Sequence, residues 1–308
     1  MTVPLACGAV LATLAPHAGT FFGSFTGALF SGSLPLLAVF YVCMGATISL
    51  RSLPGVIKRG GALMAAKIGL GVLAGVVLGR VLGTQPIATG WLTGLSTLAV
   101  VAAINDTNGG LYMALMRRYG SAEQAASYSV MALESGPFLT MVTLGIAGLS
   151  SFPWQTFAGA ILPLCVGMVL GNLDPEIRAF LGQGVPVIIP FFAFALGTTL
   201  DLHLVWTAGL LGLLLGLTTL CVSAVVLMAV DKLIGGNGTA GIAASTTAGN
   251  AAAVPMLVAA ANKEYFAAAR AATVLVASSV VVTSLLVPLL TAYWHGWMAS
   301  RHAAKVEE

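Results

Sequence analysis

The chain has 308 residues, of which 58% are hydrophobic and 7% charged, and it carries a net charge of +3. Soluble domains have about 25% charged residues, so the composition excludes a water-soluble globular protein, and the small, dispersed positive charge does not indicate nucleic-acid binding. With a mean hydropathy of +0.98, the sequence predicts an all-α polytopic membrane protein, because a helix satisfies its own backbone hydrogen bonds inside the bilayer.

The apolar segments, at about 20 residues per span, predict ten transmembrane helices. The fourth and the ninth are expected to be broken by polar residues near their middle. The predicted spans are residues 3–15, 33–49, 61–82, 90–117, 124–149, 155–173, 185–200, 205–230, 238–262 and 266–293. The first covers only about 20 Å at 1.5 Å per residue, and we expect the natural start of the protein to lie upstream of Met1.

Lysines and arginines are distributed unequally between the two sides that these spans define. Arg80, Lys263 and Arg270 fall on one side, and nine cations fall on the other. The nine are Arg51, Lys58, Arg59, Arg117, Arg118, Arg178, Lys232, Arg301 and Lys305. Positive residues favour the cytoplasmic side, so we expect both termini to be cytoplasmic.

The sequence also repeats itself. Residues 4–16 (PLACGAVLATLAP) match residues 163–175 (PLCVGMVLGNLDP) at seven of thirteen positions, and residues 44–50 match residues 196–202 at Gly, Thr and Leu. The break in the fourth span has a counterpart in the ninth. Five spans per copy place the second copy upside down, a pattern typical of secondary transporters. The expected division is into two inverted five-helix repeats, residues 1–150 and 151–308.

The fourth span is interrupted by Asn105, Asp106, Thr107 and Asn108, which two glycines follow. A broken helix leaves backbone groups unpaired in hydrocarbon unless it lines a site, and a carboxylate at that depth binds a cation or takes a proton. We expect Asp106, with the oxygens of Asn105 and Thr107, to bind the coupling ion. The alternative is that Asp106 caps the second half-helix, since Asp is a favoured N-cap.

Glu134 is a second acidic residue near mid-depth, in the fifth span. The Gly-Pro pair after Ser135 weakens the helix, so we expect Glu134 and Ser135 to contribute to the coupling-ion site. H⁺ is one candidate ion, and Na⁺ held by Asn105, Asp106 and Glu134 is the other. Lys67, in the third span, has three interpretations: it extends toward the cytoplasmic face, it pairs with one of the two carboxylates, or it attracts an anionic substrate.

The ninth span is interrupted by uncharged polar residues, which fit the recognition of a hydroxylated solute. Half-helices that start near Asn108 and Asn250 would point positive dipole ends at the centre, which favours an anion. We therefore expect both breaks to contribute to substrate binding. The expected residues are Asn108, Gly109, Ser245, Thr246, Thr247 and Asn250. A small-residue motif for helix packing is the alternative.

Five motifs resemble those of the bacterial 2-keto-3-deoxygluconate permease family, and the likeness as a whole extends from the first Pro-Leu motif, at Pro4, to about Trp294. They are residues 108–112 (NGGLY), 134–137 (ESGP), 171–178 (GNLDPEIR), 189–197 (IPFFAFALG) and 231–236 (DKLIGG). The resemblance implies a proton-coupled importer of 2-keto-3-deoxygluconate, a sugar acid from pectin breakdown, in the bacterial inner membrane.

That family is similar to the bile acid/sodium symporter superfamily. The similarity implies ten helices in two inverted repeats, with a panel domain and a core domain in which the broken fourth and ninth helices cross. It also implies elevator-type alternating access and cation sites beside the crossing, to which the fifth helix contributes Glu134.

Three alternatives remain open at this stage. A sodium-coupled symporter of another organic anion would have the same layout. An intramembrane enzyme of the prenyltransferase type would need a second acidic residue to hold Mg²⁺, and Gly109 and Gly110 stand in its place. A channel would show a continuous ring of charge. We expect no resident cofactor, and we expect a sugar-acid anion and the lipid bilayer as partners of a monomer or a homodimer.

Overall fold

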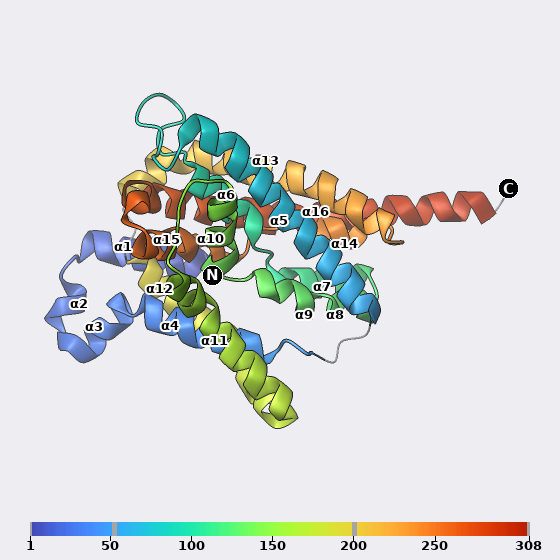
Figure 1. Ribbon diagram of the computed structural model, residues 1–308, viewed down its shortest axis with the longest axis horizontal. Coiled ribbons are helices and arrows are strands. Elements are labelled where there is room, and N and C mark those ends of the chain that lie inside the picture. Colours follow the sequence, from blue (N-terminus) through green and yellow to red (C-terminus); the bar gives the residue numbers. More distant parts are fainter. Residues whose placement is uncertain (1, 51–53, 199–201, 307–308) are drawn as a thin grey trace.

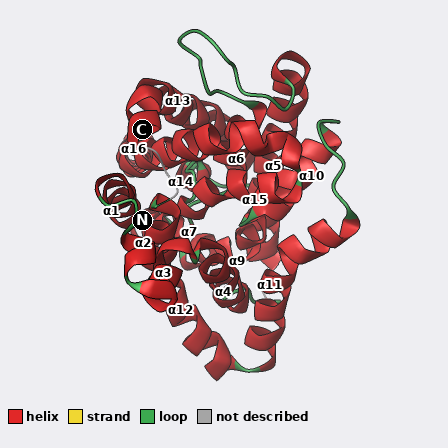
Figure 2. Ribbon diagram, turned by 90° about the vertical axis from the view of Figure 1, so that its left-hand side faces the viewer, coloured by secondary structure: helices red, strands yellow, loops and turns green. Residues whose placement is uncertain are grey.

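The computed structural model describes residues 2–50, 54–198 and 202–306. Within these ranges the chain consists of helices and connecting loops and contains no β-strand (Figures 1 and 2). Arg51, one of the cations that indicated the orientation, lies outside them. The all-α class that the composition predicts is confirmed.

Most of the helices follow one another along the chain with short connections, and the connection between Leu82 and Thr97 is longer. They are α1 (Thr2–Leu14), α2 (Ala18–Phe21), α3 (Gly23–Ser31), α4 (Ser33–Ala46), α5 (Pro54–Leu82), α6 (Thr97–Asn105), α7 (Gly109–Tyr119), α8 (Ala122–Ala126), α9 (Tyr128–Met131), α10 (Pro137–Ile146), α11 (Trp154–Leu173), α12 (Pro175–Gly197), α13 (Leu202–Leu233), α14 (Thr239–Ala244), α15 (Val254–Ala261) and α16 (Phe266–Val306). Three short 3₁₀ helices are η1 (Ala132–Glu134), η2 (Gly249–Ala253) and η3 (Lys263–Tyr265).

Six helical stretches of the described chain are long and apolar enough to cross a membrane, or up to eight if each of two bent pairs is one span. The bent pairs are α3 with α4, at 61°, and residues 122–134 with α10, at 63°. Helix α1 has 13 residues and is shorter than a full span. A multi-pass membrane protein is thus confirmed, and the number of ten spans stays a prediction.

The predicted start of the fourth span is wrong. The prediction begins this span at residue 90, but α6 begins at Thr97, where the side chain of Ser96 accepts a hydrogen bond from Ala99 N at 3.2 Å. The preceding connection turns at Gly90 and Gly94, whose φ angles of 87° and 90° suit glycine. This connection is the long loop at the top of Figures 1 and 2.

The segment between the first two predicted spans is helical, although no helix is predicted there. Helices α2 and α3 form a hairpin in which a side chain at Gly27 would collide with the carbonyl of Gly19. With four and nine residues, these helices are too short for their periodicity to be recognised in the sequence.

Four helices, α1, α4, α11 and α12, pack against one another through glycine. A side chain at Gly8 of α1 would collide with the backbone of α12, and Gly197 of α12 packs in the same way on α1. Gly45 of α4 and Gly167 of α11 make the corresponding contacts between α4 and α11. Small residues let helix backbones approach closely in lipid, so these four helices form one tightly packed unit, which we call the panel group.

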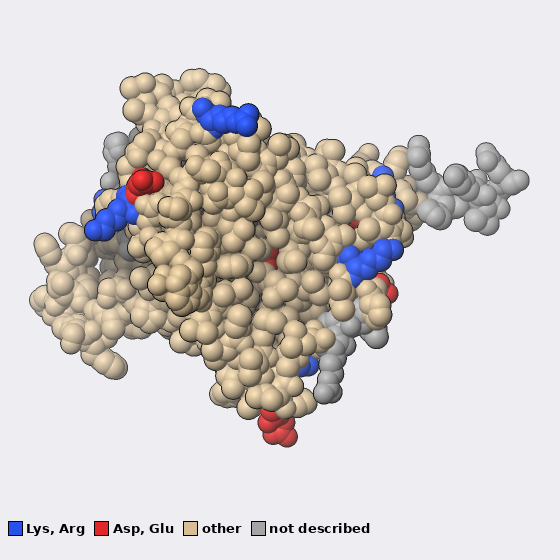
Figure 3. All heavy atoms as spheres, in the orientation of Figure 1, with Lys and Arg blue, Asp and Glu red and all other residues tan. Residues whose placement is uncertain are grey.

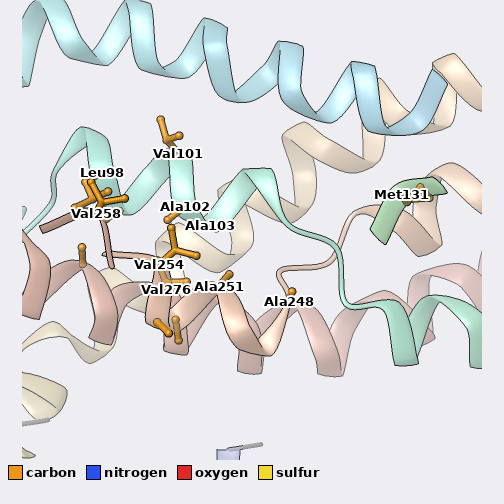
Figure 4. Packing of buried hydrophobic residues seen from close by; sticks show 14 of the residues in the cluster. Leu98, Val101, Ala102, Ala103, Met131, Ala248, Ala251, Val254, Val258 and Val276 are labelled. Carbon is orange, nitrogen blue, oxygen red and sulfur yellow. The ribbon is translucent and has the colours of Figure 1, made fainter. Parts of the chain in front are cut away.

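The remaining long helices form a second unit, the core group, around the two interrupted segments. Helices α13 and α16 run alongside each other in the upper part of Figure 1, and α5 crosses the view diagonally toward the lower right; α6 packs on α5, α14 on α13 and α15 on α16. Figure 4 shows the interior of this unit, where Ala102 and Ala103 of α6 face Ala251 and Val254 of the second interrupted segment. Alanine on both sides allows the two interrupted segments to lie close together.

The outer surface is apolar and poor in charge. Large side chains such as Leu210, Val225 and Leu289 are 63–70% exposed, and Figure 3 shows one face on which charged side chains lie mainly near the margins. In water such a surface would aggregate, so it fits contact with lipid.

Candidate functional site

The two interrupted segments meet in the centre of the core group and pair with each other. Ala248 N donates to the carbonyl of Asp106 at 2.9 Å, and Asn108 N donates to Thr246 Oγ1 at 2.9 Å. The Thr247 hydroxyl donates to the carbonyl of Ala103 at 2.9 Å. Each break therefore satisfies backbone groups that the other leaves free, which is the condition for non-helical chain at this depth.

The chain leaves the helical conformation at the residues that the sequence singled out. Asp106 has extended φ and ψ angles of −124° and 130°, and α7 starts after Asn108, whose side chain caps it by accepting a hydrogen bond from Leu111 N at 3.1 Å. The second break runs from Ser245 to Ala248, between α14 and η2. Asn108, and not Asp106, is thus the N-cap, so the capping alternative for Asp106 is wrong.

The Asp106 side chain is 2% exposed and is held from the second break and from the fifth segment. Its Oδ2 accepts a hydrogen bond from Asn250 Nδ2 at 2.8 Å, and its Oδ1 accepts one from the Ser135 hydroxyl at 3.3 Å. The backbone N–H of Gly136 also donates to this carboxylate. These three donors stabilise the ionised form of the buried Asp106 carboxylate, and a proton or a cation can neutralise its charge.

Glu134 lies on the other side of the first break. Its Oε1 accepts a hydrogen bond from Thr107 N at 2.8 Å, whereas its Oε2 has no hydrogen-bond partner among the described residues. The helix is interrupted directly after Glu134, as the Gly-Pro pair predicts. The 3₁₀ helix η1 ends at Glu134, and the chain turns at Gly136, with a φ of 110°, into α10. A buried carboxylate oxygen without a donor is costly, and a proton or a bound cation would satisfy it.

Lys67 is fully buried and points into the centre, so the interpretation that it extends toward the cytoplasmic face is wrong. The reason is the length of α5, which begins at Pro54 and places Lys67 about 20 Å along the helix at 1.5 Å per residue. Its ammonium donates to Thr107 Oγ1 at 2.8 Å, to the carbonyl of Thr246 at 2.7 Å and to the carbonyl of Ala244 at 3.1 Å.

The two carboxylates act on Lys67 electrostatically but are not in contact with it. Both Glu134 and Asp106 contribute to its electrostatic environment, and Arg59–Asp231 is the one ion pair within 4.0 Å among the described residues. The three charged groups of the site, Lys67, Asp106 and Glu134, therefore interact through the first break and not by direct pairing.

Asn105 faces α5 and α10. Its Nδ2 donates to the Thr143 hydroxyl at 3.0 Å, and its Oδ1, which lies against Gly71, has no hydrogen-bond partner among the described residues. Asn105 and Glu134 thus each present one unpaired oxygen, the kind of ligand that Na⁺ prefers.

A cavity of about 860 Å³ lies between the panel group and the core group. On one side it is lined by the start of α7, from Asn108 to Gly110, by Asn250 of the second interrupted segment and by Tyr128 of α9. On the other side the panel group contributes apolar residues of α4 and α12, among them Phe40 and Phe192. The volume is that of a typical small-molecule site, and one end of it is formed by a helix N-terminus.

Three of the expected substrate-binding residues line this cavity and three do not. Asn108, Gly109 and Asn250 line it, whereas the side chains of Ser245, Thr246 and Thr247 are fully buried and bonded within the protein. The hydroxyl of Thr247 also shares a hydrogen bond with Ser279 at 2.8 Å, and its N–H donates to Thr283 Oγ1 at 3.0 Å.

Several residues of the site are not found from the sequence. Tyr41, whose hydroxyl lies 3.5 Å from Asn250 Nδ2, and Thr143 belong to otherwise apolar helices. A hydroxyl in the middle of an apolar span is the only signal that could have identified them. The cavity wall formed by Phe40 and Phe192 carries no such signal, because these residues look like any others of a helix interior.

Comparison with known proteins gives matches over nearly the whole length. The chain matches the family model described as 2-keto-3-deoxygluconate permease over residues 1–300. Curated 2-keto-3-deoxygluconate permeases of Escherichia coli O7:K1 (strain IAI39), O9:H4 (strain HS) and strain K12/DH10B are 48% identical to it over 308 residues, which are 100% of this chain and 94% of each relative. The chain therefore belongs to the 2-keto-3-deoxygluconate permease family, whose members are transporters and not enzymes.

Proposed function

We propose that this protein imports 2-keto-3-deoxygluconate, as an anion, by symport with a proton across the bacterial inner membrane. The observation that carries the proposal is the position of Asn250, which lines the cavity and donates a hydrogen bond to Asp106 at 2.8 Å. A side chain that contacts both the solute space and the buried carboxylate can make substrate binding depend on the protonation of that carboxylate. The family and its curated members support the choice of substrate.

The substrate carboxylate binds at the start of α7. This helix has 11 residues, and its first turn, from Asn108 to Gly110, faces the cavity. Unpaired N–H groups and the positive end of the helix dipole favour an anion there. The sugar hydroxyls then meet Asn250 and the hydroxyl groups on the cavity wall, of which Thr47 and Ser129 are members.

The charge count of the site supports coupling to a cation. Lys67, Asp106 and Glu134 together carry a net charge of −1 when all three are ionised, and all are at most 2% exposed. Burying a net charge is costly, so one proton or one monovalent cation stabilises the loaded state. Asp106, with its hydrogen bond to Asn250, is the proposed proton acceptor.

The proposed cycle is of the elevator type, with two inverted repeats at residues 1–150 and 151–308 and both termini in the cytoplasm. In this scheme the panel group stays in place and the core group carries the site. The contact of Gly8 with α12 and that of Gly167 with α4 support the repeat, because the two glycines are equivalent in the alignment of residues 4–16 with residues 163–175. The cavity between the two groups supports the division into a fixed and a moving part.

A second candidate is Na⁺-coupled transport of a related organic anion. The unpaired oxygens of Asn105 and Glu134 favour it. A Na⁺ ion binds several oxygen ligands at once, whereas a proton needs only one oxygen.

Uptake of labelled 2-keto-3-deoxygluconate into proteoliposomes tests both. Accumulation that follows an imposed pH gradient in the absence of Na⁺ is expected, and accumulation that requires a Na⁺ gradient identifies Na⁺ as the coupling ion. The number of protons per anion is measured by setting the membrane potential with potassium and valinomycin. Uptake with one proton per anion is independent of the potential, whereas uptake with two protons depends on it. Failure to take up the sugar acid under either gradient would refute the proposal.

A further inference from the structure

We propose that the ammonium of Lys67 is a built-in cation that joins the two interrupted segments and occupies a position that a mobile monovalent cation would otherwise fill. The observation is that its three hydrogen bonds all go to oxygens in the two breaks or at the helix end beside them. One is to Thr107 of the first break, and two are to the carbonyls of Ala244 and Thr246 at the second. Lys67 comes from a third element, α5, which belongs to neither break.

The hydrogen bonding of the ammonium is complete. A lysine side chain has three N–H donors and no acceptor, and the three oxygens lie 2.7 to 3.1 Å from Nζ. The Thr107 hydroxyl in turn donates to the carbonyl of Ala244 at 3.3 Å. The oxygen set of one hydroxyl and two carbonyls is the type that binds alkali cations in proteins, so the same positions suit a tethered ammonium or a free ion.

The carbonyls need this cation because the break leaves them without their helical partners. Ala244 ends α14, and Thr246 lies in the break itself, where the chain is not helical. Both residues are fully buried, and unsatisfied carbonyls at the end of a helix carry partial negative charge. Glu134 and Asp106 add two formal negative charges to the surroundings of Lys67. A single positive charge at Nζ therefore stabilises carbonyls and carboxylates together.

Lys67 acts through the breaks and not on the substrate. It does not belong to the lining of the cavity, and it is fully buried behind Thr107 and Thr246. Lys67 is thus a positioning residue. Its ammonium fixes the position of Thr107, and the N–H of Thr107 donates a hydrogen bond to Glu134. It also fixes the position of Thr246, and the hydroxyl of Thr246 accepts a hydrogen bond from Asn108 N at the start of α7.

The consequence is a latent cation site. Shortening Lys67 to alanine removes the charge and leaves a space lined by three oxygens and flanked by two carboxylates, which a small cation can enter. Lys67→Met removes the charge but keeps most of the volume, so no ion can enter. The exposed Lys58 of the same helix, whose Nζ lies 3.4 Å from the carbonyl of Ile234, offers the matched control Lys58→Ala.

The test is thermal unfolding of the purified full-length protein in detergent, titrated separately with methylammonium, sodium and choline chlorides. Lys67→Ala should have a lowered Tm that rises by several degrees and saturates with methylammonium or Na⁺, as expected for a ligand that binds only the folded state. Choline is too large for the site and serves as the ionic-strength control. Wild type, Lys58→Ala and Lys67→Met should respond to methylammonium no more than they respond to choline, because none of them has the vacated space. An equal response of Lys67→Ala to all three salts would overturn the proposal.

Two further measurements cover the case in which the single variants do not fold. Lys67→Met/Glu134→Gln removes one charge of each sign, and it should recover at least part of the yield and Tm that Lys67→Met loses; a double variant no better than Lys67→Met would also overturn the proposal. In proteoliposomes, Lys67→Ala should take up substrate only with methylammonium or Na⁺ present. This last readout depends on the proposed function, whereas the Tm titrations do not, so failure of the two proposals can be told apart.

Discussion

Asn250→Ala tests the link between substrate and coupling site most directly. Alanine removes the amide from the cavity wall and removes the donor that lies 2.8 Å from Asp106 Oδ2. Loss of one hydrogen bond to a neutral substrate hydroxyl costs about 1 kcal/mol, and loss of one to an ionised carboxylate costs about 1.5–3 kcal/mol. Since 1.4 kcal/mol is a factor of ten, the half-saturating concentration should rise about fivefold, and the maximal rate under a pH gradient should fall about tenfold or more.

The assay is initial-rate uptake into proteoliposomes over a range of substrate concentrations at a fixed pH gradient. Asn262→Ala is the matched control, because Asn262 also makes side-chain hydrogen bonds, to Ser150 Oγ at 2.5 Å and from Glu264 N at 3.0 Å, but lies outside the cavity lining. The control should lower the Tm and leave the half-saturating concentration unchanged. Wild-type values of both kinetic parameters in Asn250→Ala would refute the assignment of this residue.

Three other predictions concern charge and packing. Asp106→Asn and Glu134→Gln should each abolish uptake driven by a pH gradient and leave the Tm near that of wild type; full accumulation by both would remove the proposed coupling site. Arg59→Met leaves Asp231 buried without its ion-pair partner. This costs about 3–5 kcal/mol of stability, so the Tm should fall by many degrees. Arg80→Met, at an exposed arginine, is the control. Gly167→Ala should lower the Tm by forcing α11 away from the carbonyl of Val42, and an unchanged Tm would contradict the packing described for the panel group.

The sequence predicts the two breaks correctly because their signal is chemical and local. Four polar residues and two glycines interrupt an apolar run at Asn105, and the helix ends there in the structure. The bend after Glu134 is predicted for the same reason, since Gly-Pro weakens a helix whatever surrounds it.

The partners of Lys67 and the opposite wall of the cavity could not be predicted in this way. Two of the three oxygens on Lys67 are backbone carbonyls, which every residue has, so the sequence carries no trace of them. Phe40 and Phe192 become cavity residues only because the panel group stands opposite α7. The sequence predicts that Thr246 and Thr247 face the substrate, but their hydroxyls hold the two breaks together, and polarity alone does not distinguish these roles.

The glycine contacts of the panel group have a mechanical consequence. Where one backbone rests directly on another, as at Gly45 and Gly197, no flexible side chains lie between the helices to absorb sliding. Neither lipid tails nor water can enter such a seam. These four helices are therefore expected to move as one rigid body. In the proposed cycle, the displacement that exposes the solute to one compartment after the other would take place along the boundary that holds the cavity.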